Sequence, residues 1–366
     1  MTERKKNRVT LCLLAALLAG FGLWGLVRPG QDISDVERRK LAQRPELTAD
    51  ALLTGTFQRQ TEKWAADQFP LRQSFRRIKA AVNTYVLGQW DTNGVYLAEG
   101  YAERLDYPIR AESLAHAAGR MQYLYERYLQ ESGGQLYLAV IPDKNAFLAA
   151  ENGYPAMDYA ALTEQLRQQT PFLQYIDLSG QLTKEDYYRT DLHWRQERLE
   201  GVARYLAGAM GTQLMGTYRQ VTLPRPFYGV YYGYAALPME PDALTYLTGD
   251  ALEKYRVYNY EIDSWGGVYD LEKAEGRDMY EVFLSGSVSL LRIENPEAET
   301  ERELVIFRDS FASSLAPLLA EGYRAVTLID IRYIPSAYLG SYVDFSGKDV
   351  LFLYSTGVLN HSETLK

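Results

Sequence analysis

An Asp-x-His pair and a distant serine are the residues of this sequence best suited to catalysis. Asp191 and His193 lie two residues apart, and Ser310 follows the predicted strand 303–307. In an extended segment, side chains two residues apart point to the same side, so Asp191 can reach a ring nitrogen of His193. A histidine held in this way can take the proton of a serine hydroxyl and make the serine a nucleophile. A serine, a histidine and a carboxylate in this arrangement can carry out acyl transfer through the serine.

Each of these residues also has a structural interpretation. Asp191 can cap a helix that runs over about 193–210. Ser310 or Asp309 can likewise cap the helix expected over 311–321. Both alternatives rest on position in the chain alone, so the surrounding elements must decide between the two interpretations.

From about residue 107 the chain alternates between helical and strand patterns. Such alternation predicts an α/β fold in which helices cover both faces of a parallel sheet. An apolar run bounded by turn residues, such as 136–141, is typical of a buried parallel strand. The expected helices are 111–132 and 159–169, and the expected strands are 136–141, 172–178, 303–307, 325–331 and 349–354.

The candidate residues would meet at one edge of this sheet. Ser310 follows one predicted strand, the Asp-x-His pair comes after another, and open α/β sheets bind ligands at the carboxyl ends of their strands. The backbone amide of Ser310 or Phe311 would lie at a helix N-terminus and could serve an oxyanion hole. This coincidence at one edge favours the catalytic interpretation.

The N-terminus predicts a membrane anchor. Residues 4–8 carry four basic side chains, and residues 9–27 carry no charge. As a helix, the uncharged stretch is about 28 Å long, which matches the hydrocarbon thickness of a bilayer. The basic side is expected in the cytoplasm, which places the rest of a single-pass cell-membrane protein outside. A cleaved signal peptide has a similar layout, but its apolar core is usually shorter.

The expected domain organisation follows from these patterns. Residues 1–28 form the cytoplasmic tail and the transmembrane anchor, and residues 29–106 form a linker and a helical region interrupted at Pro70. Residues 107–366 form the α/β domain. A β-rich insertion is expected over about 216–300, because three segments there are short, aromatic and bounded by turns: 218–223, 228–234 and 256–262.

Composition and charge exclude other classes of site. The one cysteine, Cys12, lies in the apolar N-terminal stretch, so the rest of the chain offers no thiol nucleophile and no disulfide. The three histidines lack metal-binding spacing, so no metal or other cofactor is expected, and His361 is left as an alternative base. Residues 1–28 carry a net charge of +4, so the overall −8 leaves −12 on residues 29–366. A domain this acidic is not expected to bind nucleic acid.

Four further residues are candidates for substrate binding. Asp143 and Lys144 follow the first predicted strand and would border the site, although a Pro-Asp-Lys turn is the alternative. Arg332 follows another strand at the same edge and could bind an anionic group or form a structural ion pair. Tyr232 lies in the tyrosine-rich run 228–234, whose rings suit either sugar binding or packing.

Several short motifs, in a fixed order, resemble the DHHW protein family. This family is similar to the alginate O-acetyltransferase proteins, which contain an SGNH-hydrolase-like domain. The resemblance extends over most of the chain from the anchor onward. Its motifs are Asp67-Gln-Phe-Pro-Leu-Arg72, Ile141-Pro-Asp-Lys144, Thr190-Asp-Leu-His-Trp194, Asp278-Met-Tyr-Glu-Val-Phe-Leu284, Phe307-Arg-Asp-Ser-Phe-Ala312, Leu315-Ala-Pro-Leu318 and Ile329-Asp-Ile-Arg-Tyr333.

The resemblance implies a flavodoxin-like, permuted α/β fold in which the Asp-x-His element precedes the serine. It implies that Ser310 is the nucleophile, His193 the base and Asp191 the acid that orients the base. Two positions differ from the family pattern. Leu192 replaces a histidine of the motif that names the family, and the segment 285–287, Ser-Gly-Ser, replaces Gly-Gly-Asn. An Asn amide is a natural oxyanion donor, and this chain lacks it.

The sequence therefore predicts a membrane-anchored, extracytoplasmic serine O-acyltransferase or esterase acting on cell-envelope polysaccharide. Acetyl is the expected acyl group, and the resemblance suggests a membrane-bound O-acyltransferase as the acyl donor. The alternative is a non-catalytic envelope protein that binds polysaccharide or protein on the same fold. Similarity to the D-alanyl transfer proteins of teichoic acid would keep the serine chemistry and change the acyl group.

Overall fold

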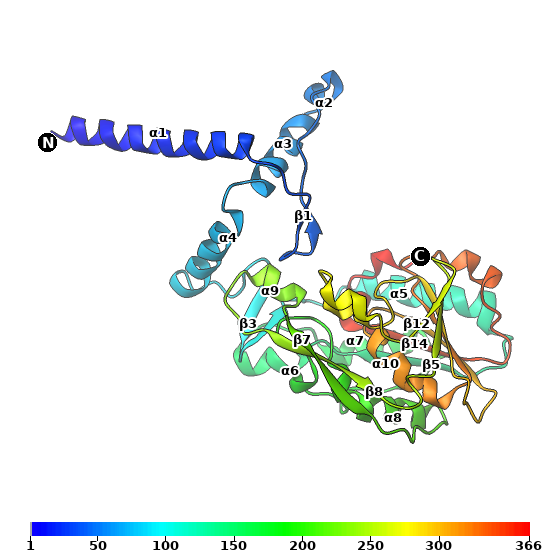
Figure 1. Cartoon of the computed structure of the whole chain (residues 1–366). Coiled ribbons are helices and arrows are strands. Elements are labelled where there is room, and N and C mark those ends of the chain that lie inside the picture. Colours follow the sequence, from blue (N-terminus) through cyan, green and yellow to red (C-terminus); the bar gives the residue numbers. More distant parts are fainter. Residues whose placement is uncertain (1) are drawn as a thin grey trace. The chain divides into compact units, whose positions relative to one another are not determined.

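The computed structural model describes residues 2–366, which form two compact units (Figure 1). The first unit comprises the chain up to Asn93 together with Tyr232–Pro238. The second unit comprises Gly94–Tyr231 and Met239–Lys366, and it holds the predicted α/β elements.

The second unit is built on an eight-stranded sheet of order β10-β9-β11-β13-β12-β14-β5-β6. Five of its strands run parallel to one another, and they coincide with the five predicted from apolar runs. The prediction of an α/β fold on a parallel sheet is therefore confirmed. The five strands are β5 (Leu136–Ile141), β6 (Gln174–Ile176), β12 (Glu303–Arg308), β13 (Ala325–Ile329) and β14 (Asp349–Ser355).

Antiparallel strands extend one edge of this sheet, because β11 pairs with both β13 and β9, and β9 pairs with β10. Part of the stretch 216–300 therefore belongs to the main sheet, while β7 and β8 form a separate antiparallel hairpin. These elements are β7 (Arg219–Phe227), β8 (Asp242–Thr248), β9 (Arg256–Asn259), β10 (Ser264–Gly266) and β11 (Leu290–Glu294).

The expectation of a short strand over 228–234 is wrong. These residues overlap the helix α9 (Val230–Ala235). Tyr231 and Ala235 lie four residues apart and are both buried, as expected for one face of a helix. A short aromatic run does not distinguish a strand from a buried helical turn.

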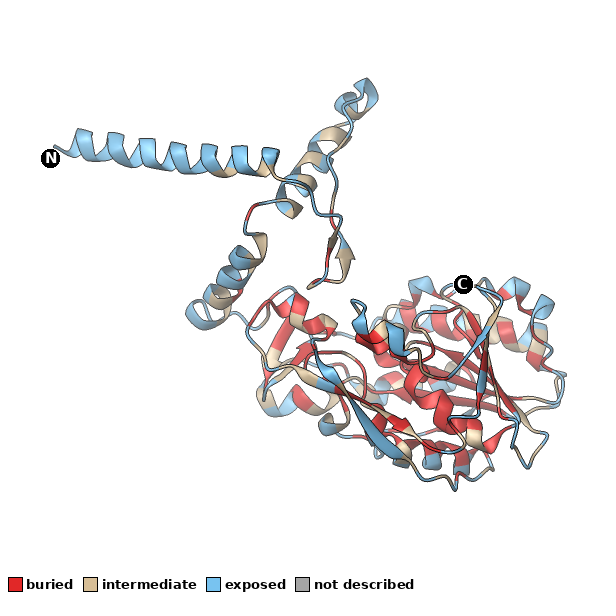
Figure 2. Cartoon of the chain, viewed as in Figure 1, coloured by how far each residue is buried: buried red, intermediate tan, exposed pale blue. Residues whose placement is uncertain are grey.

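Helices cover both faces of the sheet. Leu304 and Ile306 of β12 join the hydrophobic core on one face, and Val305 and Phe307 join the core on the other. Figure 2 shows that buried residues are concentrated in the second unit. Helices α8 (Glu200–Ala209) and α10 (Ala312–Leu319) cover the first face, and α5 (Ala111–Leu124), with its π-helical extension Tyr125–Leu129, and α7 (Tyr159–Gln169) cover the second.

The helix expected over 193–210 begins only at Glu200, the first residue of α8. The residues before it form a loop closed by a β-bridge between Tyr187 and Trp194. Asp191 lies inside this loop and not at a helix N-terminus. The capping alternative for Asp191 is therefore wrong, because backbone pairing holds the segment in a non-helical conformation.

The first unit contains the helix α1 (Glu3–Val27). Among residues 2–366, α1 is the one helix long and apolar enough to cross a membrane, by length and composition. The expected break at Pro70 is confirmed, since α3 (Thr56–Asp67) ends before it and α4 (Arg72–Ala81) begins after it. The other short elements are β1 (Ile33–Ser34), β2 (Arg39–Lys40) and α2 (Ala49–Leu53) in this unit, and β3 (Val95–Ala98), β4 (Tyr101–Arg104), α6 (Asn145–Leu148) and α11 (Thr356–Asn360) in the second.

Candidate active site

Ser310 lies at the carboxyl edge of the sheet, between the end of β12 and the start of α10. The preceding Asp309 fixes this turn, because its carboxylate accepts hydrogen bonds from the Phe311 N–H (3.0 Å) and from the Ser355 N–H and hydroxyl (2.8 and 2.7 Å). Ser355 ends the neighbouring strand β14, so the turn is tied to the sheet. The N-cap residue of α10 is Phe311 and not Ser310, and the Ser310 side chain remains partly exposed.

His193 joins Ser310 to Asp191 through a continuous chain of hydrogen bonds. The Nε2 atom of His193 lies 2.7 Å from Ser310 Oγ, and its Nδ1 atom lies 2.6 Å from Asp191 Oδ1. The same carboxylate oxygen accepts the backbone N–H of His193 at 3.1 Å, which fixes the carboxylate beside the ring. The structure thus brings together all three residues that the sequence singled out.

The arrangement can support serine chemistry if Nδ1 carries the proton. Asp191 then accepts the Nδ1–H hydrogen bond, and Nε2 is free to accept the proton of the Ser310 hydroxyl. Asp191 is fully buried and His193 is 6% exposed, so few water molecules compete for these hydrogen bonds.

One backbone N–H and one side-chain ammonium hold Asp191 in place. The Val230 N–H donates to its second carboxylate oxygen at 2.9 Å, and the Lys144 ammonium donates to its carbonyl oxygen at 2.7 Å. Gly229 passes so close that a Cβ built on it would lie 2.3 Å from the Asp191 Cβ. Only glycine allows this approach of the two segments.

The Tyr280 ring stacks on the face of the His193 imidazole. Its ring lies parallel to His193, with centroids 3.8 Å apart and an interplanar angle of 8°. The Tyr280 hydroxyl lies 2.8 Å from Ser314 Oγ, and the Trp194 indole N–H donates to Ser314 Oγ at 2.9 Å. Burial raises the pKa of Tyr280 well above its ordinary value, so this ring stays neutral.

The amide of Ser310 is the better of the two expected oxyanion donors. The Phe311 N–H already donates to Asp309, whereas the Ser310 N–H has no hydrogen-bond acceptor among residues 2–366. In the segment that lacks the family Asn, the Ser285 hydroxyl donates to Asp270 at 3.1 Å. The proton of that hydroxyl is therefore not available to replace the Asn amide.

Lys144 is fully buried behind the site and does not reach solvent. Its ammonium donates to the carbonyl oxygens of Ala102, Tyr188 and Asp191 at 2.7, 2.8 and 2.7 Å. These three bonds use all three ammonium protons. This geometry favours a structural role for Lys144 over contact with a substrate.

Two acidic residues accompany this lysine. Glu103 lies 3.6 Å from the Lys144 ammonium, and burial raises the pKa of Glu103 to about 8. Asp143 accepts hydrogen bonds from the hydroxyls of Tyr159 (2.5 Å) and Thr356 (3.2 Å). Burial raises the pKa of Asp143 to about 6. Both carboxyls therefore lie close to the carboxyl end of β5, which Asp143 and Lys144 follow in the chain.

The other predicted residues lie apart from the hydrogen-bond chain. Arg332 forms a two-pronged ion pair with Asp330, at 2.8 and 2.6 Å, which is the structural alternative considered from the sequence. Tyr232 belongs to the first unit, where its hydroxyl accepts a hydrogen bond from Arg77 at 3.3 Å. His361 contacts Asp106 and not Ser310. Substrate binding by Arg332 and Tyr232 stays a prediction.

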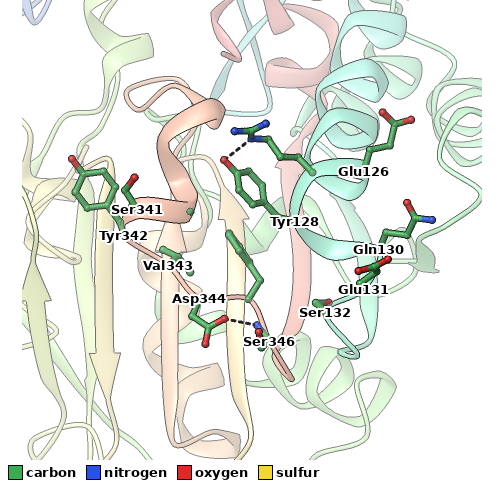
Figure 3. Close-up of a pocket in the computed structure, with 13 residues that line it drawn as sticks. Glu126, Tyr128, Gln130, Glu131, Ser132, Ser341, Tyr342, Val343, Asp344 and Ser346 are labelled. Atoms are coloured by element: carbon green, nitrogen blue, oxygen red, sulfur yellow. Dashed lines mark hydrogen bonds between the residues drawn. The ribbon is translucent and has the colours of Figure 1, made fainter.

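A cavity of about 750 Å³ opens elsewhere in the second unit (Figure 3). It is lined by Tyr128, Ser132 and residues 340–346, which precede β5 and β14 and so lie at the opposite edge of the sheet from Ser310. None of the three hydrogen-bonded residues lines it. Among residues 2–366, no group of three or more His, Cys, Asp or Glu side chains could hold a metal ion.

Sequence reasoning missed two residues that are distant in sequence and contact His193 or Asp191 in the fold. Tyr280 lies in a motif quoted for the family resemblance, but its stacking on His193 depends on tertiary packing. Gly229 lies in a tyrosine-rich run. A glycine at such a position could have indicated that two backbone segments pass close to each other there.

Comparison with protein families identifies a related domain. A family model described as the SGNH hydrolase-like domain of the acetyltransferase AlgX matches residues 101–230. This stretch contains Asp191 and His193 and ends before Ser310. Comparison with the curated proteins gives no match.

Solved structures share the fold. A DHHW family protein from Eubacterium siraeum is 19% identical, with a TM-score of 0.60, and the match covers 75% of this chain and 95% of that chain. PatB1 from Bacillus cereus is 16% identical, with a TM-score of 0.58, and the match covers 74% of this chain and 98% of that chain. PatB1 with a sulfonyl adduct gives the same identity and TM-score, with 72% and 95% covered. The resemblance to DHHW and SGNH-hydrolase-like acetyltransferase proteins is thereby confirmed.

Proposed function

We propose that this chain is a membrane-anchored serine O-acyltransferase that acts on a cell-envelope polysaccharide outside the cytoplasm. The observation that carries the proposal is the unbroken hydrogen-bond chain from Ser310 Oγ through His193 to Asp191. The match to an acetyltransferase domain model over residues 101–230 supports acetyl as the acyl group.

In the first step, Ser310 Oγ attacks the carbonyl carbon of the acyl donor. His193 Nε2 takes the hydroxyl proton as the new C–O bond forms, and Asp191 stabilises the resulting imidazolium. The Ser310 N–H is the candidate to stabilise the negative oxygen of the tetrahedral intermediate. The intermediate collapses when the bond to the leaving group breaks and His193 returns the proton to that group, which leaves an acyl-serine.

In the second step, a sugar hydroxyl takes the acyl group. His193 removes the hydroxyl proton while the sugar oxygen attacks the acyl-serine, and Ser310 leaves as the protonated alcohol. If water attacks instead, the same site is an esterase. The acceptor therefore decides the class of reaction, and the triad is common to both.

The proposed membrane location is supported by α1, which is long and apolar enough to span a bilayer. The basic residues at its start favour a cytoplasmic N-terminus and an extracytoplasmic second unit. A membrane-bound O-acyltransferase is the proposed acyl donor, because a carrier of activated acyl groups in the cytoplasm cannot reach an external serine by itself.

A sulfonyl fluoride tests the nucleophile directly, since such reagents sulfonylate activated serine hydroxyls and release fluoride. The full chain in detergent, Ser310→Ala, His193→Ala and the control Ser346→Ala would be labelled and mapped by mass spectrometry. Ser346 is an exposed serine outside the site. We expect an adduct on Ser310 in the unchanged chain and in the control, and none in the other two variants.

The same four proteins would be assayed for acetyl release from an activated ester. Acetyl release that depends on both Ser310 and His193 would support acyl chemistry. A Ser310 that reacts with neither reagent would overturn the proposal and favour a binding protein on this fold, the candidate to which the missing Asn donor at 285–287 points.

A further inference from the structure

The first unit carries a long apolar face that points away from its own packing. Leu71, Phe75, Ile78, Val82 and Val86 recur at the spacing of one helical face along α4 and the π-helical turn Val82–Val86. All five are exposed, with Ile78 at 59% and Val86 at 74%. A soluble helix normally buries this face.

The polar face of the same helix is the one that packs. Arg72 forms an ion pair with Glu37, and the Arg76 guanidinium donates to the Gly233 carbonyl at 2.9 Å. Ala80, on the same side, is fully buried. The helix is therefore inverted relative to a soluble one, with its polar side inward and its apolar side outward.

Aromatic contacts make this apolar face continuous with α1. Phe21 of α1 stacks on Phe69 with centroids 5.6 Å apart and planes 3° apart, and its edge meets Phe75 at 5.9 Å. Phe21 lies six residues before Val27, the end of α1, which corresponds to about 9 Å along the helix axis. This matches the depth of about 5–10 Å at which interfacial helices bury their apolar side.

We infer that α4 and its π-helical extension lie in the membrane interface, with the apolar face in the outer leaflet. The inference rests on the proposed role of α1 as the membrane anchor. The occupant is lipid and not a second protein, because the face begins where α1 would leave the bilayer. Exposed Lys79 flanks the face, where its long side chain can reach the phospholipid headgroups.

The lipid contact gives the first unit a second attachment to the membrane besides α1. A single spanning helix leaves a domain free to rotate about the helix axis, whereas a second helix lying in the interface restrains that rotation. The first unit would thus be held in one orientation against the outer leaflet.

The single native cysteine makes a direct test possible. In a Cys12→Ser background, nitroxide labels would be placed by Ile78→Cys and Val82→Cys on the apolar face, and by Arg77→Cys at an exposed polar position outside that face. Leu17→Cys would report on α1. Each full-length variant would be reconstituted in vesicles of equimolar phosphatidylcholine and phosphatidylglycerol, and label collisions would be measured with oxygen, which enters lipid, and with a water-soluble nickel chelate.

We expect the labels at 78 and 82 to shift to lipid-like accessibility, with high oxygen and low nickel collision rates, while the label at 77 stays water-like. Water-like values at both 78 and 82 would overturn the inference. Protection of both positions from both reagents would also overturn it, since that result indicates protein packing. A lipid-like label at 17 with water-like labels at 78 and 82 would refute the inference alone, whereas a water-like label at 17 would refute the anchor. Neither result bears on the Ser310 labelling.

Discussion

The phenol ring of Tyr280 lies flat against the imidazole of His193, with ring centroids 3.8 Å apart. The contact fixes the ring plane, while the hydrogen bond to Asp191 fixes its rotation within that plane. Together they leave Nε2 aimed at Ser310.

Removal of the Tyr280 ring should slow the reaction of Ser310. An aromatic pair of this kind is worth about 0.5–1.5 kcal/mol, so Tyr280→Ala should lower kcat/KM for an activated acetyl ester by about 2- to 10-fold. Tyr280→Phe keeps the ring and loses only the contact with Ser314, so it should retain most of the activity. Equal losses in both variants would show that the hydroxyl, and not the stacking, supports His193.

Gly229→Ala should displace Asp191. The new Cβ would lie 2.3 Å from the Asp191 Cβ and 2.4 Å from the Thr190 carbonyl oxygen, so the two segments must move apart. A displacement of about 1 Å in a catalytic group can cost about 100-fold in rate, and we expect a loss of that size in kcat.

Gly201→Ala in α8 is the matched control, because a Cβ at Gly201 meets no atom within 4 Å. It should leave the activity unchanged and slightly stabilise the helix. A Gly229→Ala protein with full activity would show that Asp191 is not needed in its observed position.

The fold was largely predictable because its strands are buried on both faces. The run 136–141 has no charged residue, and the turn residues on either side of it predicted both ends of β5 correctly. The loop around Asp191 was harder, since the β-bridge between Tyr187 and Trp194 that keeps it non-helical is a tertiary feature. The Tyr280 stacking and the Gly229 approach could not be predicted for the same reason: they join segments far apart in the sequence.

Lys144→Met should destabilise the second unit strongly. The change leaves three buried carbonyl oxygens without a donor and Glu103 without its cation. Above pH 8, where Glu103 is ionised in the folded chain, loss of one partner of a buried pair costs about 3–5 kcal/mol, and we expect a decrease of this size in the free energy of unfolding, measured by chemical denaturation. Adding Glu103→Gln should recover part of the loss, and an additive double variant would contradict the pairing.

Glu103 should make the stability depend on pH. Burial raises its pKa to about 8 in the folded chain, above an ordinary value of 4.5, so the folded state keeps a proton that the unfolded state releases. The free energy of unfolding should therefore fall as the pH rises from 4.5 to 8. Between pH 6.5 and 7.5 the decrease should be about 1 kcal/mol.

Asp143 contributes a slope of the same sign at lower pH, because burial raises its pKa from 3.8 to about 6. Above pH 6.5 Asp143 has lost most of its proton, so the measurement there reports mainly on Glu103. Denaturation of Glu103→Gln over the same range is the control, and its stability should be flatter. An unchanged slope in that variant would assign the pH dependence to another group.

Ser287→Asn should raise the activity, because position 287 corresponds to the Asn of the Gly-Gly-Asn segment. The backbone here suits that segment: Ser285 and Gly286 have φ values of +58° and +84°, a conformation that favours glycine. One oxyanion donor is worth about 100- to 1000-fold in kcat where the site is preorganised. A newly introduced amide lacks that support, so we expect a gain of about tenfold in acetyl ester turnover.

Ser287→Asp separates the amide from the size of the side chain. Aspartate has nearly the same shape as asparagine, but its carboxylate offers no N–H and would repel the negative oxygen of the intermediate. We expect no gain, or a loss, in this variant. A gain from both substitutions would indicate a change in loop structure. No gain from Ser287→Asn would indicate that the Ser310 N–H and the surrounding backbone already stabilise the oxyanion without a side-chain donor at 287.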